Sequence, residues 1–133
     1  MFVMPTGKRI LIADDSKTMT SITYRILKDA NYTDIDVVRD GVSALAALRR
    51  KEYDLVITDR QMQPISGLEL TKLIRADAQL SKVRIILVTG LYDEGDEVWL
   101  DGADGYLTKP FEPRDLTQKV EDVLSTVALL ASG

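Results

Sequence analysis

The chain of 133 residues contains no cysteine and no histidine. The absence of cysteine excludes disulfides and thiolate metal sites. The absence of histidine removes the usual zinc ligand, the base of most catalytic triads and the side chain that exchanges protons near neutral pH. Chemistry at any site in this chain must therefore use carboxylates, hydroxyls, lysine and a hard cation.

Long apolar runs and an excess of positive charge are also lacking. No apolar stretch approaches the roughly 20 residues of a membrane span. The start, MFVMPTG, has neither the basic residues nor the apolar length of a signal peptide. With 17 basic and 21 acidic residues, the net charge of −4 argues against a nucleic-acid-binding surface. We expect a cytoplasmic protein that neither enters a membrane nor binds nucleic acid.

The length and composition indicate one globular domain, with 45% hydrophobic and 29% charged residues. We expect residues 1–7 to be a disordered lead-in, residues 8–130 to form the domain and residues 131–133 to be a tail. Five short apolar runs predict strands, at residues 9–13, 34–38, 54–58, 83–88 and 104–107. Three of them are continuous blocks, which is typical of parallel strands covered on both faces.

Helical patterns follow each of these runs. Ser16 can cap a helix that ends near residue 30, and Ser66 to Glu69 has the pattern of a capping box. The other helices are expected from Asp40-Gly41, over about 94–101 and from Pro113. In the first three helices the spacing predicts these inward side chains: Ile22, Ile26, Leu27, Val42, Leu45, Leu48, Leu70, Leu73 and Ile74. Strands alternating with helices predict an α/β three-layer sandwich with a parallel five-stranded sheet.

Polar side chains stand where these strands end, and sites in such sheets lie beyond the carboxyl ends of the strands. They are Asp14, Asp15, Asp59, Thr89 and Lys109. Three neighbouring carboxylates require either a proton or a cation, and an oxygen-only site favours Mg²⁺. A carboxylate beside this ion can attack a phosphoryl group. Each residue alone has an ordinary alternative, such as a helix cap, a turn or a surface lysine, but their occurrence together favours a site.

The motifs LIADDS, DLVITD, LVTG and GADGYLTKPF, at these separations, resemble the receiver domain of two-component response regulators. The closest type is the single-domain, CheY-like form, and the resemblance runs from about residue 8 to residue 124. It implies a flavodoxin-like (βα)5 fold with a sheet of order 2-1-3-4-5. It also implies a cis peptide bond between Lys109 and Pro110.

The resemblance also implies a role for each matching residue. Asp59 would be the phosphoacceptor. Asp15, Asp59 and the backbone carbonyl of Gln61 would bind Mg²⁺ directly, with Asp14 acting through water and Mn²⁺ able to substitute. Lys109 would pair with the phosphoryl group or with Asp59. Thr89 would be the switch hydroxyl, and Tyr106 would be the switch aromatic side chain.

The chain departs from the family pattern at two positions. The proline that usually stands four residues after the acceptor is replaced by Gln63, and a proline follows as Pro64. Gly67 still stands where the family has its glycine, so the change is a substitution and not an insertion. We expect the loop to be shaped differently from that of other family members. Gly90 replaces the usual alanine, which keeps the phosphate pocket open, leaves a backbone N–H for the phosphoryl group and makes the loop more flexible.

The implied function is that of a stand-alone receiver phosphorylated on Asp59 by a sensor histidine kinase or phosphotransfer protein. Its output would be contact with a downstream protein that the sequence does not identify, as a monomer or a phosphorylation-dependent dimer. It would catalyse only its own phosphorylation and dephosphorylation. Gln61 and Leu91 flank the path of attacking water and would tune the phosphoryl lifetime. The alternatives are a phosphorelay intermediate or phosphate sink, and a binding module that works without phosphorylation.

The expected helix over 94–101 carries Trp99, the only tryptophan. Val98 fits the inward position, so Trp99 lies about 100° further round the helix and reaches partial exposure. We expect Trp99 and Tyr106 to belong to an output face. The alternative is a tryptophan at the edge of the core, because most tryptophans are largely buried.

Two rival classes share parts of this pattern. A haloacid-dehalogenase-type phosphatase also uses an aspartyl nucleophile with Mg²⁺, but it needs a second aspartate where this chain has Gln61. A flavodoxin-like cofactor carrier must cradle phosphate in its first loop, where Asp14 and Asp15 would repel it.

Overall fold

The computed structural model describes residues 7–90 and 102–132, with side chains as far as residue 125. The helix expected over 94–101 lies outside the described residues, and so do Leu91, Trp99 and the first six residues of the expected lead-in.

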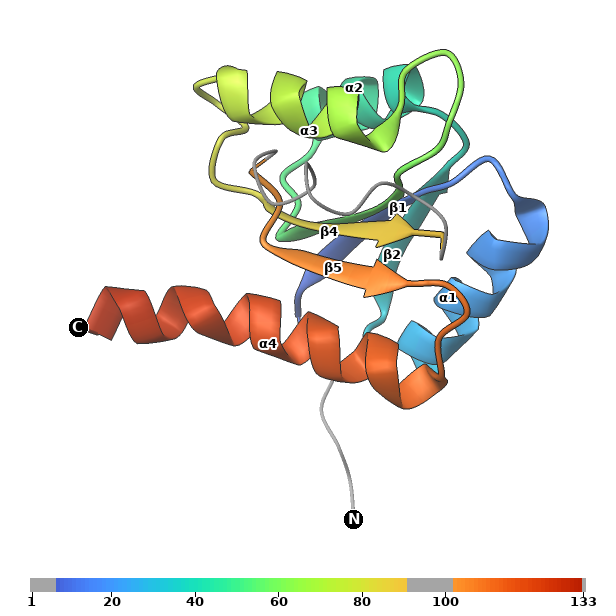
Figure 1. Cartoon of the computed structure of the whole chain (residues 1–133). Helices are drawn as coiled ribbons and strands as arrows, with labels where there is room; N and C mark the ends of the chain where they lie inside the picture. The colour runs from blue at the N-terminus through green and yellow to red at the C-terminus, as the bar shows by residue number, and fades with distance from the viewer. Residues whose placement is uncertain (1–6, 91–101, 133) are drawn as a thin grey trace.

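Five parallel strands form one sheet, in the order β2-β1-β3-β4-β5 (Figure 1). The strands are β1 (Arg9–Ala13), β2 (Asp34–Val38), β3 (Leu55–Asp59), β4 (Arg84–Thr89) and β5 (Gly105–Thr108). The predicted strand order and parallel pairing are thereby confirmed. The last three strands begin and end one residue later than expected, so that Asp59 is the last residue of β3 and Thr89 the last of β4.

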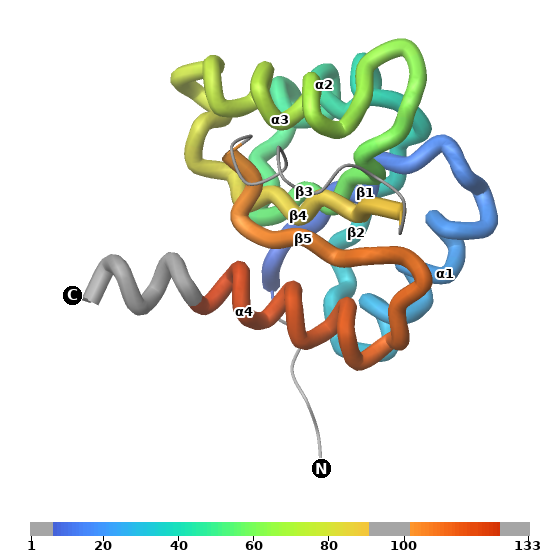
Figure 2. The backbone as a smooth tube through the Cα atoms, in the orientation of Figure 1, coloured from blue at the N-terminus to red at the C-terminus, as the bar shows by residue number. Residues whose placement is uncertain are grey.

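Helices cover both faces of the sheet, as the ribbon in Figure 1 and the backbone tube in Figure 2 show. They are α1 (Lys17–Asp29), α2 (Gly41–Arg50), α3 (Gly67–Ala76) and α4 (Pro113–Ser132). Side chains of α1 and α4 pack with Ile10, Ile12 and Ile57 on one face. Side chains of α2 and α3 pack with Leu11 and Val56 on the other. Because successive strand residues point to opposite faces, each continuous apolar run supplies both cores.

Local sequence sets the beginnings of three helices. Ser16 accepts a hydrogen bond from the Met19 N–H, and Asp40 accepts one from the Ser43 N–H. Ser66 and Glu69 form the predicted capping box, in which each side chain bonds the backbone of the other. No helix in the described residues has the combined length and apolar character that a membrane span requires.

Three predictions of inward side chains are wrong. Ile22, Val42 and Leu73 are 44%, 53% and 45% exposed. The inward positions are held instead by smaller or more polar neighbours, which lie about 100° to 200° round the same helices: Thr20, Thr23, Ala44, Ala47 and Thr71. Small residues let a helix approach the sheet closely, so size and not hydrophobicity alone decided which side faces inward.

Candidate functional site

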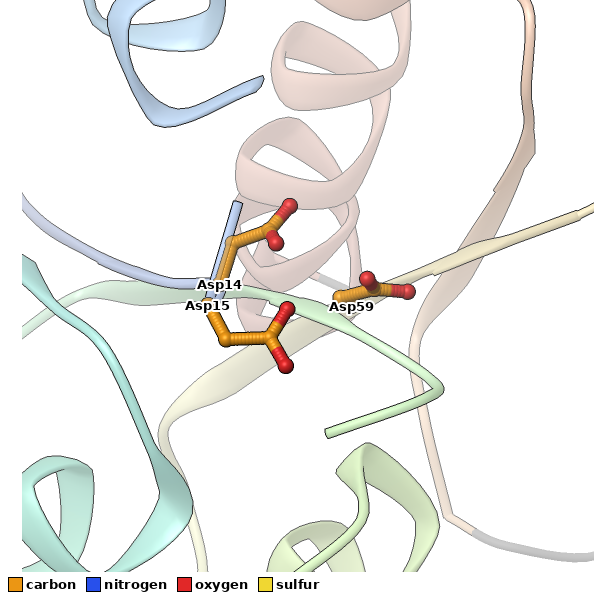
Figure 3. Close-up of side chains that lie close together, drawn as sticks. All are labelled: Asp14, Asp15 and Asp59. Atoms are coloured by element: carbon orange, nitrogen blue, oxygen red, sulfur yellow. The ribbon is translucent and has the colours of Figure 1, made fainter. Parts of the chain in front are cut away.

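Three carboxyl groups meet at the carboxyl edge of the sheet (Figure 3). Strand β1 pairs with β3 so that Ala13 lies opposite Thr58. The next residue is Asp14 after β1 and Asp59 in β3. Asp15 follows directly, and one oxygen of each carboxylate lies within 4.8 Å of one from each of the others. Among the described residues, no other group of three acidic side chains comes together in this way.

The charge of this cluster is only partly compensated by the protein. Asp14 and Asp59 are each 7% exposed, while Asp15 is exposed. Burial raises the pKa of the Asp14 carboxyl above its ordinary value, and the neighbouring Asp59 and Asp15 raise it further. The Ser16 N–H, 2.8 Å from Asp14 Oδ1, and the charge of Lys109 act in the opposite direction. A cation among the carboxylates would relieve this repulsion, and their oxygens are the ligands that Mg²⁺ prefers.

Lys109 reaches the same site from the end of β5. Its Nζ atom lies 3.2 Å from Asp59 Oδ2. The Lys109 N–H donates to the Thr89 carbonyl at 2.7 Å, which continues the pairing of β4 with β5 by one residue. The predicted cis peptide bond between Lys109 and Pro110 is confirmed. Lysine and aspartate, 50 positions apart in sequence, are thus brought into direct contact by the sheet.

The loop after Asp59 is held close to the acceptor position. The Gln61 N–H donates to Asp59 Oδ1 at 3.2 Å, and the Arg60 N–H donates to the Val88 carbonyl at 2.9 Å. The peptide bond between Gln63 and Pro64 is also cis, which neither the sequence nor the family resemblance predicted. The Gln61 side chain is exposed beside the site. The hydrogen bonds of Arg60 and Gln61 therefore hold the beginning of this loop beside Asp59, and the expected difference in loop shape from other family members stays a prediction.

Gly67 is a positioning residue, a role that its match to a family position did not reveal. A Cβ atom there would lie 2.1 Å from the carbonyl oxygen of Asp59. The Gly67 N–H also donates to the Arg60 carbonyl at 2.9 Å. A glycine directly after a helix-capping serine was the available signal, because an ordinary helix start favours residues with a side chain.

The remaining predicted residues surround the same edge. Asp59 lies opposite Val88 in the β3–β4 pairing, so Thr89 is the next residue of the neighbouring strand. Thr89 and Gly90 are half-buried. Tyr106 is half-buried in β5, opposite Leu87. The structure thus brings Asp14, Asp15, Asp59 and Lys109 into one cluster and places Thr89 beside it.

Comparison with known proteins assigns this arrangement to a class. The family model of the response regulator receiver domain matches residues 10–121. The chain belongs to this family, which acts in two-component signal transduction. Because the chain belongs to the receiver family, the two rival classes, a haloacid-dehalogenase-type phosphatase and a flavodoxin-like cofactor carrier, are not supported.

Individual relatives agree with this assignment. The chemotaxis protein CheY of Pseudomonas aeruginosa is 33% identical over 121 residues, which cover 90% of this chain and 98% of the relative. The receiver domain of a histidine kinase from Syntrophus aciditrophicus is 32% identical, with a TM-score of 0.84 and coverage of 91% and 92%. The receiver domain of a sensor histidine kinase from P. aeruginosa is 26% identical, with a TM-score of 0.82 and coverage of 90% and 99%. That structure has a magnesium ion coordinated in its active site cleft.

Proposed function

We propose that this chain is a Mg²⁺-dependent phosphoacceptor switch in which Asp59 accepts a phosphoryl group from a histidine kinase or phosphotransfer protein. The observation that carries the proposal is the contact of Lys109 Nζ with Asp59 Oδ2, 3.2 Å, inside a cluster of three carboxylates. A carboxylate held beside both a cation site and an ammonium group is suited to attack phosphorus, because the incoming group is itself an anion.

The covalent step is a transfer between two acceptors. An Asp59 carboxylate oxygen forms a bond to phosphorus while the P–N bond of the donor phosphohistidine breaks, and the electron pair stays on the imidazole. With a small donor such as acetyl phosphate, the P–O bond breaks and acetate leaves. Lys109 neutralises part of the phosphoryl charge, and the Thr89 hydroxyl and the Gly90 N–H donate to phosphoryl oxygens.

Mg²⁺ would be held by Asp15, Asp59 and the Gln61 backbone carbonyl, with Asp14 acting through water. When bound, the ion supplies positive charge between the carboxylates and the phosphoryl oxygens. Mn²⁺ is expected to substitute, because it also prefers oxygen ligands. The crowding of the three carboxylates supports this. The pKa of the Asp14 carboxyl is raised mainly by burial and further by Asp59 and Asp15, so a nearby cation would favour its charged form.

The output is a reversible contact with a downstream protein, made by a cytoplasmic monomer or a phosphorylation-dependent dimer. Tyr106 and Trp99 are proposed to contribute to the contact face, and Gln61 and Leu91 to tune the lifetime of the phosphoryl group. Two of the similar solved structures are receiver domains of histidine kinases. This similarity favours, as a second candidate, an intermediate that passes the phosphoryl group on to another protein.

Intact-mass spectrometry after incubation with acetyl phosphate and Mg²⁺ tests the proposal. Wild type should gain one phosphoryl group, while Asp59→Asn and a wild-type sample in EDTA should gain none. Asp29→Asn, which makes the same change at an exposed position of α1, is the matched control and should label like wild type. An Asp59→Asn protein that labels to the wild-type extent would refute the assignment.

A further inference from the structure

The end of the molecule opposite Asp59 contains a groove of about 1,140 Å³. Its walls are the beginning of β1, the end of α2 with the turn that follows, and the connection from α3 to β4. The strand arrows in Figure 1 point away from this edge of the sheet. The groove is therefore separate from the carboxylate cluster, which lies at the carboxyl ends of the strands.

Positive charge is concentrated in this groove. Seven basic and two acidic residues line it, the acidic ones being Glu52 and Asp54. The surplus of five positive charges contrasts with the net charge of −4 of the whole chain. Carboxylates beside the groove balance part of this surplus, and the remaining positive charge needs an explanation.

Three of these basic side chains form ion pairs with carboxylates of neighbouring elements. Arg9 pairs with Asp34 at 3.0 Å, Lys51 pairs with Asp36 at 2.9 Å, and Arg84 pairs with Asp104 at 3.2 Å. Their carboxylate partners lie on β2 or just before β5, so these pairs tie neighbouring elements together at the amino edge of the sheet. They are already compensated and are not the groups that a ligand would use.

Three other basic side chains remain available. Arg49 is 61% exposed, and its Nε atom lies 3.8 Å from Asp77 Oδ2, at the outer limit of an ion pair. Arg50 and Lys82 are exposed and have no hydrogen bond or ion pair within the part of the chain that the structure describes. Leu48, Leu80 and Val83 are buried beneath the groove and give it a packed base.

A helix-stabilising role accounts for only part of this arrangement. Arg49 and Arg50 lie in the last turn of α2, where positive charge interacts favourably with the helix dipole. Lys82 lies on a different wall, in the connection before β4, and among the residues that the structure describes it neither caps a helix nor pairs with a carboxylate. The convergence of all three on one groove is therefore not explained by helix stability.

We propose that this groove, which we call the basic groove, binds an acidic peptide segment of a partner protein through Arg49, Arg50 and Lys82. Arginine guanidinium groups bind carboxylates in a bidentate manner, and lysine adds a point charge. A peptide is favoured over nucleic acid because Glu52 and Asp54 line the same groove and the whole chain is negative. A long polyanion would be repelled by the rest of the surface.

The test is fluorescence polarisation with a short fluorescein-labelled peptide in which glutamate alternates with serine and leucine. Wild type should bind it saturably, and binding should weaken as salt screens the charges. The double variant Arg50→Glu/Lys82→Glu should bind at least about tenfold more weakly, because it turns attraction into repulsion. Lys72→Glu/Arg114→Glu is the matched control: it makes the same residue changes at exposed positions outside the groove and should alter binding by less than about twofold.

Several outcomes would overturn the proposal. One is the absence of saturable peptide binding by wild type. Another is a control variant that loses as much peptide affinity as the groove variant. A third is that wild type binds a short double-stranded DNA more tightly than the peptide and the groove variant loses this DNA binding. Sedimentation equilibrium that shows wild-type self-association abolished by Arg50→Glu/Lys82→Glu would also overturn it, by assigning the groove to a second copy of the chain. The groove variant should still label on Asp59 with acetyl phosphate, so failure of this inference is distinguishable from failure of the proposed function.

Discussion

The first residue of α3, Gly67, packs directly on the backbone of Asp59. A Cβ atom at Gly67 would lie 2.1 Å from the Asp59 carbonyl oxygen and 2.9 Å from the Cα atom of Arg60. Real side chains do not approach backbone atoms this closely, so the position accepts only glycine unless the loop moves. The placement of α3 and the position of the Asp59 backbone are therefore coupled.

Gly67→Ala should destabilise the protein and disturb the site. Helix propensity alone favours alanine by about 0.5–1 kcal/mol. The clash should outweigh this gain and lower the free energy of unfolding by about 1–3 kcal/mol. Urea denaturation measures the change, and calorimetric titration of Mg²⁺ should show weaker binding. A variant as stable as wild type with unchanged Mg²⁺ affinity would mean that the loop relaxes without cost.

Asp15→Ala should weaken Mg²⁺ binding more than Asp14→Ala. Oδ1 of Asp14 already accepts the Ser16 N–H at 2.8 Å, whereas the Asp15 carboxylate is exposed beside it. This fits a direct role for Asp15 and a water-mediated role for Asp14. Isothermal titration calorimetry of both variants measures the order, and the reverse order would show that the two roles are exchanged.

Lys109→Met should tighten Mg²⁺ binding while slowing phosphorylation of Asp59. The ammonium group and the metal ion compete electrostatically for the same carboxylate, so removing the first strengthens binding of the second. The phosphoryl group loses a stabilising charge, and a loss of about tenfold or more in rate is expected from one such contact. Mg²⁺ titration and the time course of labelling separate the two effects. A variant in which the Mg²⁺ affinity and the phosphorylation rate both fall, or both rise, would contradict this account.

Tyr53→Phe should reduce stability at neutral pH but not in acid. The Tyr53 hydroxyl donates to Asp36 Oδ2 at 2.5 Å, and this bond, with Lys51, lowers the pKa of the Asp36 carboxyl. A lowered folded-state pKa contributes stability above the ordinary value of 3.8, and the contribution is lost as pH falls through the folded-state pKa. The Asp36 side chain is 41% exposed, so the expected loss at neutral pH is about 0.5–1 kcal/mol.

Thermal denaturation from neutral pH to about pH 3 tests this dependence. Tyr24→Phe is the control, because its exposed hydroxyl makes no hydrogen bond to the described residues, and its stability should follow wild type throughout. A Tyr53→Phe deficit that stays constant across the whole pH range would assign the loss to packing instead of to the Asp36 bond.

Local patterns in the sequence were sufficient for much of the fold. The apolar runs of β1 and β2 and the caps at Ser16 and Ser66 were placed correctly, because each depends on residues close along the chain. The parallel sheet followed from strands alternating with helices. The strand order did not follow from any pattern of residues and came from the family resemblance, since pairing between distant strands leaves little local trace.

The same division applies to the site. The chemistry of Asp14, Asp15, Asp59 and Lys109 follows from their residue types and from the strand ends that carry them. The convergence of the three carboxylates within 4.8 Å, and the 3.2 Å contact of Lys109 with Asp59, were decided by the register of β1, β3, β4 and β5. The close approach of Gly67 and the inward choice of Ala44 over Val42 were likewise decided by packing. Local sequence therefore determined which groups stand at strand ends and caps. Distances between groups far apart in the chain were set only by tertiary structure, because they depend on how whole elements pack.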